Sequence, residues 1–395
     1  MIQVSSRMSR STRNTTRGHT QTDLTIAMGG DWFARGRIPR AVRSRAGTTE
    51  LLRIFRDADI AFVNLEAPLT RRGSPAEKQN TLRAIPNLVD DLTAAGVDIA
   101  SIANNHMLDY GPLGLVDTIR ALRGRRIAYV GAGADLRRAR AGVTFHRKST
   151  RVGFIGFAAT LPQGFSATND RPGVSPLHVS VGVIAEGYLV LEQPGTPPPM
   201  LTIASESDLA DICYRIGELK RRVDFVVVSA HWGVAGQDTI MDYQRESARA
   251  LIRAGADLIL GHHPHRLHAI EHYRGKFIFY SIGNLVFEPL PAAGNHPELS
   301  YRGRNTAASV YALMRREGVI VVVRLRRGRI VDIDLRPVEL DLDGYPETAP
   351  DAAARVSTLL NDLPARDAVK THPRGDGTIA LGVDRSPRTA TGRAR

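Results

Sequence analysis

Five short apolar runs in this chain each end on a polar side chain of a type that binds metal ions. The runs comprise residues 24–28, 60–63, 99–103, 225–230 and 257–260. They end in turn at Asp31, Glu66, Asn105, His231 and the segment Gly261-His262-His263-Pro264-His265. Short apolar runs of this kind are typical of buried strands, and α/β proteins build sites at the carboxyl ends of such strands. The ordered set therefore predicts an α/β protein with a functional site at its strand ends.

Helical patterns alternate with these strands from about residue 24 to residue 338. Four segments are predicted to be helices: residues 86–96, 115–122, 208–222 and 243–254. Glycine ends or follows some of them, as is common at helix ends. Further strands are expected at residues 278–282, 319–326 and 330–335, with a hairpin turn at Arg327-Gly328-Arg329. The alternation predicts one layered α/β domain over residues 23–345.

Three segments depart from this alternation. Residues 1–22 are rich in Ser, Thr and Arg and nearly lack apolar side chains, which predicts a disordered basic leader. Residues 178–200 contain Gly195-Thr196-Pro197-Pro198-Pro199 near their end, so we expect a Pro-rich excursion over the surface. Residues 346–395 are expected to be a mostly disordered basic tail, because the composition becomes basic and rich in Gly, Pro and Thr.

The formal net charge of +13 is spread in a way that does not indicate a nucleic-acid partner. Residues 1–22 carry four Arg and no acid, and residues 366–395 carry seven Lys or Arg against three Asp. No stripe of aromatic residues accompanies the basic residues, so no nucleic-acid binding is expected. Cys213 is the single cysteine, which excludes an intrachain disulfide and a site of several thiolates. Neither a signal peptide nor a transmembrane segment is recognised, which predicts a cytoplasmic location.

The polar residues at the strand ends suit a pair of divalent ions. Carboxylate, amide and imidazole ligands together favour borderline ions such as Mn²⁺, Fe²⁺ or Zn²⁺. One of the two carboxylates could bridge two ions. Six ligands are more than one tetrahedral zinc needs, and they suit a two-metal site that stabilises both oxygens of a displacement. The predicted ligands are Asp31, Glu66, Asn105, His231, His263 and His265.

Two further residues are candidates for proton transfer. His106 directly follows Asn105 and could protonate a leaving oxygen as a general acid. Asp109, three residues later, could orient the His106 imidazole. Taken singly, these residues have simpler explanations: Asp31 could be a turn residue, Glu66 could cap or pair, and His106 and His231 could be satisfied buried histidines. The ordered set favours the metal site.

The chain also resembles the CapA/PgsA family of poly-γ-glutamate capsule biosynthesis proteins, which is related to the calcineurin-like metallophosphatases. The resemblance covers roughly residues 24–290. It rests on seven segments in the expected order: Gly30-Asp31, Asn64–Leu69, Ala103–Gly111, Gly131–Gly133, His231–Gly233, Gly255–His265 and Tyr280–Phe287.

This resemblance implies a four-layer α-β-β-α sandwich like that of the metallophosphatases, in which two mixed sheets are flanked by helices. It implies two divalent ions on the six ligands named above, with His106 beside them. His262 and Asn284 are expected at the rim of the site, with a turn role after Gly283 as the alternative for Asn284. Two residues differ from the metallophosphatase pattern: Phe33 stands in place of the histidine of Asp-x-His, and Glu66 replaces an aspartate.

Two functions remain open from the sequence. The first is a divalent-metal-dependent hydrolase of phosphoesterase type in capsule biosynthesis, acting on an anionic substrate. The second is a non-catalytic accessory protein of polyglutamate synthesis or export that keeps the fold to hold the polymer or partners. Membrane synthase partners and peripheral membrane association are compatible with either function. Metal content and turnover would distinguish these two functions.

Overall fold

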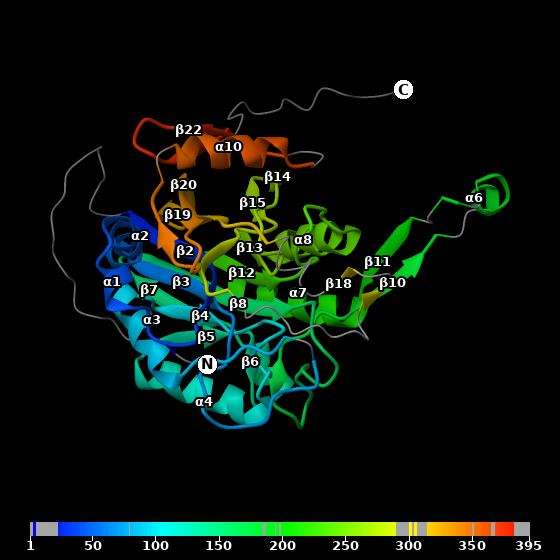
Figure 1. The fold of residues 1–395 in the computed structure, drawn as a ribbon, viewed down its shortest axis with the longest axis horizontal. Coiled ribbons are helices and arrows are strands. Elements are labelled where there is room, and N and C mark those ends of the chain that lie inside the picture. The colour runs from blue at the N-terminus through cyan, green and yellow to red at the C-terminus, as the bar shows by residue number, and fades with distance from the viewer. Residues whose placement is uncertain are drawn as a thin grey trace.

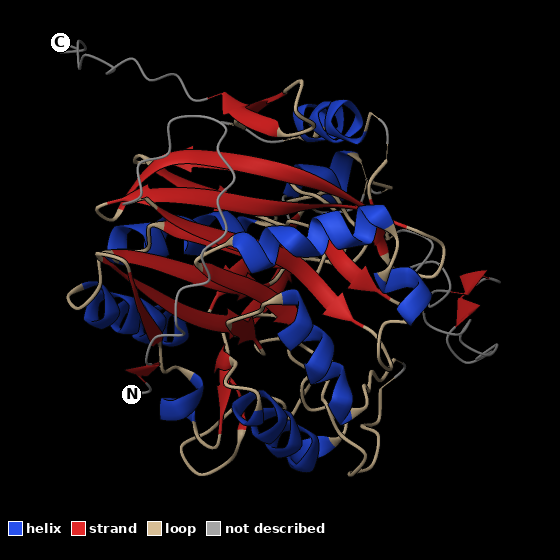
Figure 2. Ribbon diagram, turned by 90° about the vertical axis from the view of Figure 1, so that its left-hand side faces the viewer, coloured by secondary structure: helices blue, strands red, loops and turns tan. Residues whose placement is uncertain are grey.

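The computed structural model describes most of the 395-residue chain. The described residues are 3–4, 23–78, 80–184, 187–193, 195–196, 199–289, 300–301, 304–305, 314–349, 351–364 and 368–382. Their strands form two large mixed sheets with helices around them (Figures 1 and 2). Most of the predicted leader and the end of the predicted tail lie outside the described residues.

The larger sheet has ten strands. Strands β2 (Leu24–Phe33), β3 (Ile60–Leu65), β4 (Ile99–Ser101) and β5 (Ala128–Val130) run parallel up to the edge at β5, and β19 (Glu317–Arg326) lies antiparallel to β2 on the other side. Eight strands follow the order β22 (Lys370–Pro373), β23 (Ile379–Gly382), β20 (Arg329–Leu340), β19 (Glu317–Arg326), β2 (Leu24–Phe33), β3 (Ile60–Leu65), β4 (Ile99–Ser101) and β5 (Ala128–Val130). Two more strands pair outside this path, β16 (Asn284–Phe287) with β2 and β21 (Pro346–Glu347) with β20.

The second sheet has seven strands, of which β8, β12, β13 and β15 are parallel neighbours. The order is β1 (Gln3–Val4), β7 (Val143–Arg147), β8 (Thr150–Ala158), β12 (Phe225–His231), β13 (Leu258–His262), β15 (Lys276–Phe279) and β14 (Ile270–Tyr273). Three separate pairs complete the described strands: β6 (Ala132–Gly133) with β9 (Gly173–Val174), β10 (Val179–Val183) with β11 (Met200–Ala204), and β17 (Ser300–Tyr301) with β18 (Arg304–Asn305).

The five apolar runs are confirmed as strands, namely β2, β3, β4, β12 and β13. They divide between the two sheets, three in the larger one and two in the smaller one. Almost every residue of these strands is buried. This explains why they are continuous apolar runs, since strands covered on both faces show no polar alternation.

The four predicted helices are also confirmed, with boundaries that shift by a few residues. Residues 86–96 form the 3₁₀ turn η1 (Pro86–Leu88) and α3 (Val89–Ala95), and the others are α4 (Gly111–Gly124), α7 (Glu206–Lys220) and α8 (Asp242–Ala254). Gly255 ends α8 in the left-handed conformation with a φ of 119°, where a side chain would strain the backbone. The other helices among the described residues are α1 (Arg40–Arg43), α2 (Ala46–Asp57), α5 (Leu136–Ala139), α6 (Gly187–Glu192) and α10 (Ala352–Asp362).

None of the described helices is both long and apolar enough to cross a membrane.

The sheets and helices stack in four layers, which confirms the predicted α-β-β-α sandwich. On β3, Ile60 and Phe62 join the core between the two sheets, whereas Ala61 and Val63 face the core beneath α2, α3 and α4. The far side of the second sheet is covered by α7 and α8 (Figure 1). The Phe62 ring stacks on Phe154 of the second sheet with 5.9 Å between ring centroids. Interlocking side chains therefore fix the position of one sheet relative to the other.

The predicted hairpin turn at residues 327–329 is confirmed. β19 ends at Arg326 and β20 begins at Arg329, and these two residues pair with each other. Arg327 and Gly328 have φ values of 50° and 72°, the left-handed pair that a two-residue turn needs to follow the twist of its strands. The strand predicted at residues 278–282 is displaced, since β15 spans Lys276–Phe279.

The expectation of a mostly disordered tail from residue 346 is wrong for much of that segment. Residues 346–347 form β21, residues 352–362 form α10, and the hairpin of β22 and β23 adds to the edge of the larger sheet through β20. Val356 and Leu360 of α10 are buried in the main core. Composition was misleading here because a few apolar residues on one helix face are enough to attach a polar segment to an existing sheet.

The Pro-rich interval forms an arm that projects from the body of the molecule (Figure 1). We use "the arm" for β10, α6 and β11. The two strands pair antiparallel, from Val179 opposite Ala204 to Val183 opposite Met200. α6 lies at the far end.

The packing between the sheets predicts a stability effect. Phe62→Ala should lower the free energy of unfolding by about 3–5 kcal/mol, because it leaves a cavity between Phe154 and the first sheet. The urea midpoint can be followed by tryptophan fluorescence, since Trp32 and Trp232 are buried. Tyr214→Ala is the matched control, because Tyr214 is exposed and its loss should cost less than about 0.5 kcal/mol. Equal shifts in the two variants would contradict this packing role.

Candidate metal centre

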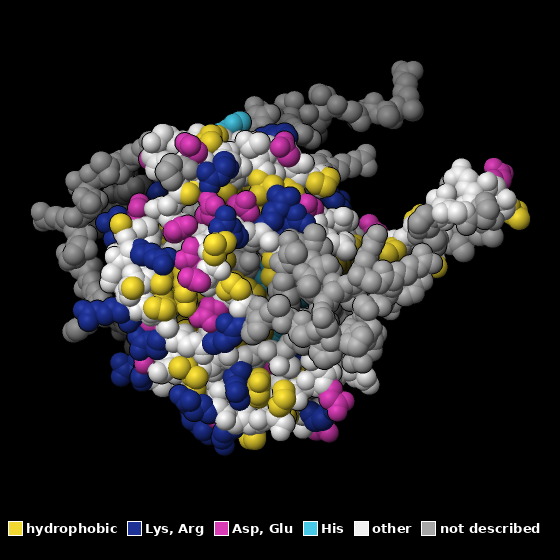
Figure 3. Space-filling model, in the orientation of Figure 1, with side chains coloured by type: hydrophobic (Ala, Val, Ile, Leu, Met, Phe, Trp, Pro, Cys, Tyr) yellow, Lys and Arg dark blue, Asp and Glu magenta, His cyan; other side chains and the backbone are white. Residues whose placement is uncertain are grey.

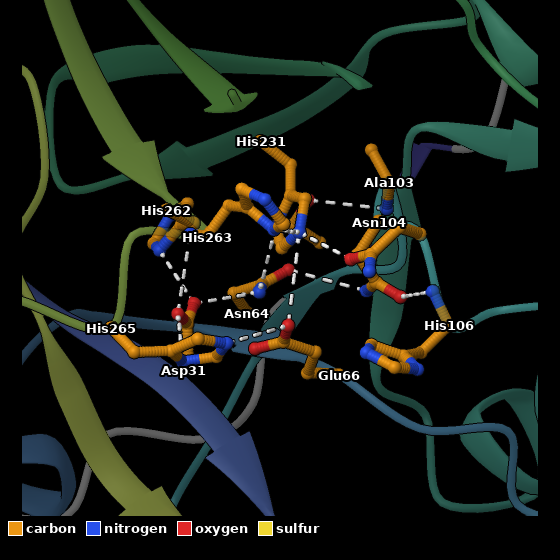
Figure 4. Close-up of polar contacts among 12 residues, drawn as sticks. Asp31, Asn64, Glu66, Ala103, Asn104, His106, His231, His262, His263 and His265 are labelled. Atoms are coloured by element: carbon orange, nitrogen blue, oxygen red, sulfur yellow. Dashed lines mark hydrogen bonds and ion pairs between the residues drawn. The ribbon is translucent and has the colours of Figure 1, made fainter. Parts of the chain in front are cut away.

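The carboxyl ends of strands from both sheets meet at one place (Figure 4). In the larger sheet β2 carries Asp31 and β3 is followed directly by Glu66, and in the smaller sheet β12 ends at His231. β13 ends at His262 and is followed by the predicted ligands His263 and His265. All these strands run in the direction that places their polar ends at the junction of the sheets.

Two groups of potential ligand atoms overlap at this junction. One consists of Asp31, Glu66 and His265, and the other of Glu66, His231 and His263, with the atoms of each group within 4.8 Å of one another. Glu66 Oε1 lies 3.5 Å from His265 Nε2 and 3.7 Å from His231 Nε2. Figure 4 shows the Glu66 carboxylate between the two imidazoles. Glu66 is therefore the carboxylate that could bridge two ions.

The surroundings of Glu66 fit a cation. Glu66 is fully buried, and neither of its carboxylate oxygens has a hydrogen-bond partner among the described residues. Burial and the nearby negative charge of Asp31 raise the pKa of Glu66 well above its usual value. A buried carboxylate without a donor or a counter-charge is very unfavourable, so this site needs either a proton or a cation.

Asp31 is held by donors on several sides. Asn64 Nδ2 donates to Asp31 Oδ1 at 2.8 Å, and the backbone N–H of His263 donates to Oδ2 at 3.3 Å. Burial by itself would raise the pKa of Asp31, but the close approach of His262 and His265 and the Asn64 bond outweigh it and lower the pKa to about 2. Asp31 is therefore an ionised carboxylate that is available to a cation.

The second group converges on one nitrogen atom. His231 Nε2 lies 2.8 Å from Asn105 Oδ1 and 3.1 Å from His263 Nδ1. Burial, together with the neighbouring His263, lowers the pKa of His231 far below its usual value, and burial lowers that of His263 to about 3. Both imidazoles are therefore neutral near pH 7, which is the form that binds metal ions. Asn105 joins this group through its amide oxygen.

The backbone at the last two predicted ligands, His263 and His265, is strained and sets the direction of their side chains. His263 and His265 have φ values of 99° and 53°, in the left-handed region, and Pro264 lies between them. Such conformations cost about 1–3 kcal/mol each outside glycine and persist where the surroundings impose them. Here they turn both imidazoles toward Glu66 within three residues.

His106 lies in contact with Asp109, the residue predicted to orient it. Its Nδ1 lies 2.6 Å from Asp109 Oδ2, which also accepts the backbone N–H of Leu82 at 2.6 Å. Lys78 Nζ pairs with Asp109 Oδ1 at 2.5 Å and donates to Asn105 O at 2.7 Å. With Nδ1 held by Asp109, the Nε2 atom remains for another partner. Burial lowers the pKa of His106 to about 4, so the ring is neutral near pH 7.

Three residues that support the centre were not assigned a role from the sequence. Asn64 binds Asp31 as described above, and Asn104 donates to Leu65 O at 2.8 Å while its Oδ1 accepts the backbone N–H of His106 at 3.2 Å. The third is Lys78. Both asparagines lie just before predicted ligands in segments that carry the family resemblance, so the sequence could have indicated that they belong to the site. Nothing in the sequence around Lys78 indicates such a role.

The two residues expected at the rim are buried instead. Asn284 is buried, and its Oδ1 lies 2.8 Å from Nδ1 of the predicted ligand His265. His262 is fully buried, with Nδ1 3.2 Å from Asp31 Oδ1 and its ring 6.0 Å from that of Phe62. Phe33 packs on Phe287 with 5.4 Å between ring centroids and offers no ligand atom.

Fold and site together define a four-layer α/β protein with a buried cluster of Asp, Glu and His that could hold metal ions. The family model for the bacterial capsule synthesis protein PGA_cap matches residues 25–289. The chain therefore belongs to the PGA_cap family. This range includes all six predicted ligands.

Relatives of known name agree with the family. The chain is 32% identical over 260 residues to "PGA biosynthesis protein CapA" of Bacillus subtilis, covering 64% of this chain and 60% of that protein. It is 34% identical over 259 residues to the "Probable polyglutamine synthesis accessory protein" of Mycobacterium tuberculosis, covering 64% and 62%. The chain thus spans about three fifths of the length of these curated relatives.

Among solved structures, a proposed 5′-nucleotidase of Staphylococcus aureus in complex with α-ketoglutarate is similar to this chain with a TM-score of 0.42 and 14% identity. The match covers 86% of this chain and 58% of that one. This likeness is weak.

The raised pKa of Glu66 predicts a stability change in metal-free protein. The Glu66 carboxyl group has a higher pKa in the folded state than in the unfolded chain, where the pKa is 4.5. Such a group lowers the stability of the folded state as the pH rises above the unfolded-state pKa. Glu66→Gln should therefore raise the free energy of unfolding at pH 7, because glutamine removes a carboxyl group whose ionisation is disfavoured in the folded state. Urea unfolding of chelator-treated protein measures this.

At about pH 4 the same two proteins should be equally stable, because Glu66 is then protonated in both states. Glu246→Gln is the matched control. Glu246 is exposed, so this substitution should leave the free energy of unfolding unchanged at either pH. A Glu66→Gln protein that is less stable than the wild type at pH 7 would contradict the assignment of Glu66 as a buried, uncompensated carboxyl group.

Proposed function

We propose that the chain is a divalent-metal-dependent hydrolase of phosphoesterase type that acts on an anionic substrate in capsule or polyglutamate biosynthesis. The observation that carries this proposal is Glu66, a buried carboxylate without a hydrogen-bond partner among the described residues that belongs to two ligand groups at once. Two ions of Mn²⁺, Fe²⁺ or Zn²⁺ would be held there. Membership in the PGA_cap family supports the biosynthetic context.

The ligands divide into two sets around Glu66. Asp31 and His265 would hold one ion with Glu66, and His231, His263 and Asn105 would hold the other with it. Bound divalent ions in such sites polarise the substrate and make water a stronger nucleophile. The protein contributes the fixed geometry, because Asn64, Asn284 and the backbone of His263 hold the ligands in place.

His106 would act as the proton donor to the leaving group. Its Nδ1 lies 2.6 Å from Asp109 and 3.2 Å from Lys78 Nζ, so Nε2 would be the atom that exchanges a proton with the substrate. Its pKa near 4 in the absence of substrate is too low for a donor at neutral pH. A negatively charged substrate beside the ring would raise that pKa, since nearby negative charge favours the imidazolium form. The need for negative charge beside His106 is consistent with an anionic substrate.

The family context narrows the substrate class. The relatives are named for synthesis of the PGA polymer or of polyglutamine, and a polyglutamate chain is itself anionic. Divalent ions activate water toward carbonyl carbon as well as phosphorus. An amide bond of such a polymer is therefore a second reaction that the same ligands could support.

A non-catalytic accessory role is the second candidate. One relative is named an accessory protein, and Phe33 supplies no ligand where the metallophosphatase pattern has a histidine. In this role the folded centre would hold polymer or a membrane synthase partner without turnover.

Metal content tests the shared carboxylate. Wild-type protein purified without chelator should contain about two ions per chain, as expected for a two-metal site. Glu66→Ala should lose both ions, and His263→Ala should keep about one on Asp31, Glu66 and His265. Glu246→Ala, with an exposed side chain, is the control. Elemental analysis gives the counts, and equal loss in the Glu66 and His263 variants would contradict a bridging role.

Turnover separates the hydrolase from the accessory protein. Wild-type protein with Mn²⁺ should hydrolyse a generic phosphodiester or phosphomonoester. His106→Asn should keep its metal and lose about 10²–10⁴-fold in rate on a substrate with a poor leaving group, as expected for removal of a general acid. The loss should be smaller on an activated aryl ester, which needs no protonation. Wild-type protein that stays metal-free and inactive with added Mn²⁺ would leave the accessory role as the better candidate.

A further inference from the structure

The arm is attached to the body only near its base. Thr202 of β11 is 6% exposed, and its Oγ1 accepts the backbone N–H of Tyr243 at the start of α8 at 3.3 Å. Val179 and Ala204 pack on the edge of the main core. Beyond this point the two strands extend away from the body toward α6 (Figure 1). A two-stranded hairpin by itself is marginally stable in water.

Both faces of the arm are apolar and exposed. Side chains alternate between the faces of a strand pair, so the register places Val181, Val183 and Met200 on one face and Ile184, Leu201 and Ile203 on the other. Their exposed fractions range from 38% to 65%. Exposed apolar patches of this kind mark interaction sites, so the arm is a candidate for contact with a partner.

The arm differs in charge from the rest of the chain. No Lys or Arg occurs between Arg171 and Arg215, although the chain has 53 of them. In the view of Figure 3, Lys and Arg side chains lie across the body, and none is seen on the coloured part of the arm. Two copies with a net charge of +13 repel each other, and this interval is where they can approach without opposing cations. Exposed edge strands commonly carry Lys or Pro to prevent pairing, and β10 has neither.

Within the described part of the chain, the hydrogen-bond register leaves the outer edge of β10 without a partner strand. Ile184 N donates to Pro199 O, and Ser205 N donates to His178 O. Bonded pairs alternate in an antiparallel ladder, so the N–H and C=O groups of Val179, Val181 and Val183 point away from β11. Among the strands that the structure describes, β10 pairs with β11 alone. The β11 edge, in contrast, lies against α8.

We infer that the arm is a dimerisation element, in which β10 pairs antiparallel with β10 of a second copy around a two-fold axis at Val181. An antiparallel edge is self-complementary, so Val179 of one copy would lie opposite Val183 of the other, as an isologous interface requires. Lipid is the less suitable partner. Hydrocarbon cannot satisfy the open N–H and C=O groups of β10, and an arm without Lys or Arg is not attracted to anionic headgroups.

Substitutions at Val181 test this pairing without disturbing the hairpin. Val181→Pro removes an N–H that points away from β11, a position where an edge strand tolerates proline. Val181→Thr keeps the N–H and the branched shape and is the matched control. Analytical ultracentrifugation of the full chain between about 1 and 100 µM covers the dissociation constants expected for weak interfaces of standard size. Wild type and Val181→Thr should double in mass over this range, whereas Val181→Pro should stay monomeric with unchanged circular dichroism.

Three results would overturn the inference. Wild type could remain monomeric throughout the range, or Val181→Pro could dimerise as well as the wild type does. Alternatively, a monomeric wild type could co-sediment with phosphatidylcholine–phosphatidylglycerol vesicles while Val181→Pro does not, which would assign the arm to lipid. Metal content should be the same in all three proteins, because the arm carries none of the ligands, so the outcome does not depend on the proposed hydrolase activity.

Discussion

The packing of one sheet on the other is the constraint on which the rest of the molecule depends. Phe62 and Phe154 interlock between the sheets, and this fixes the ends of β2 and β3 relative to those of β12 and β13. The centre is built from both sides of that junction, so no single sheet contains it. A relative shift of the sheets by a few ångströms would separate Glu66 from His231 and His265, and this explains why the core and the candidate site must be considered together.

Burial does two things at this junction. It makes the carboxylate of Glu66 unfavourable as an isolated charge, and it keeps His231 and His263 neutral. Both effects favour a bound cation, because a dication compensates the carboxylates while neutral imidazoles offer their lone pairs. The left-handed backbone at His263 and His265 is consistent with this view, since strained conformations are retained where they place functional groups.

The arm presents the opposite situation. Its apolar side chains are exposed, its β10 edge pairs with no other strand among the described residues, and it lacks the positive charge that covers the body. The candidate centre consists of polar side chains of one chain that could hold cations, whereas the arm presents backbone groups that another strand could satisfy. The two regions are therefore separate in chemistry as well as in position, and they can be tested independently.

The sequence alone determined the strands, because fully buried strands need continuous apolar residues, and it marked the six predicted ligands through the polar residues at the strand ends. It also indicated the pairing of His106 with Asp109, which is local. It could not show that Glu66 rather than Asp31 is shared by two ligand groups, or that Lys78 and Asn64 reach the centre. Nor could it show that His262 and Asn284 are buried or that residues 346–382 contribute a helix and strands. Those features depend on contacts between residues far apart in the chain, which form only when the two sheets pack together.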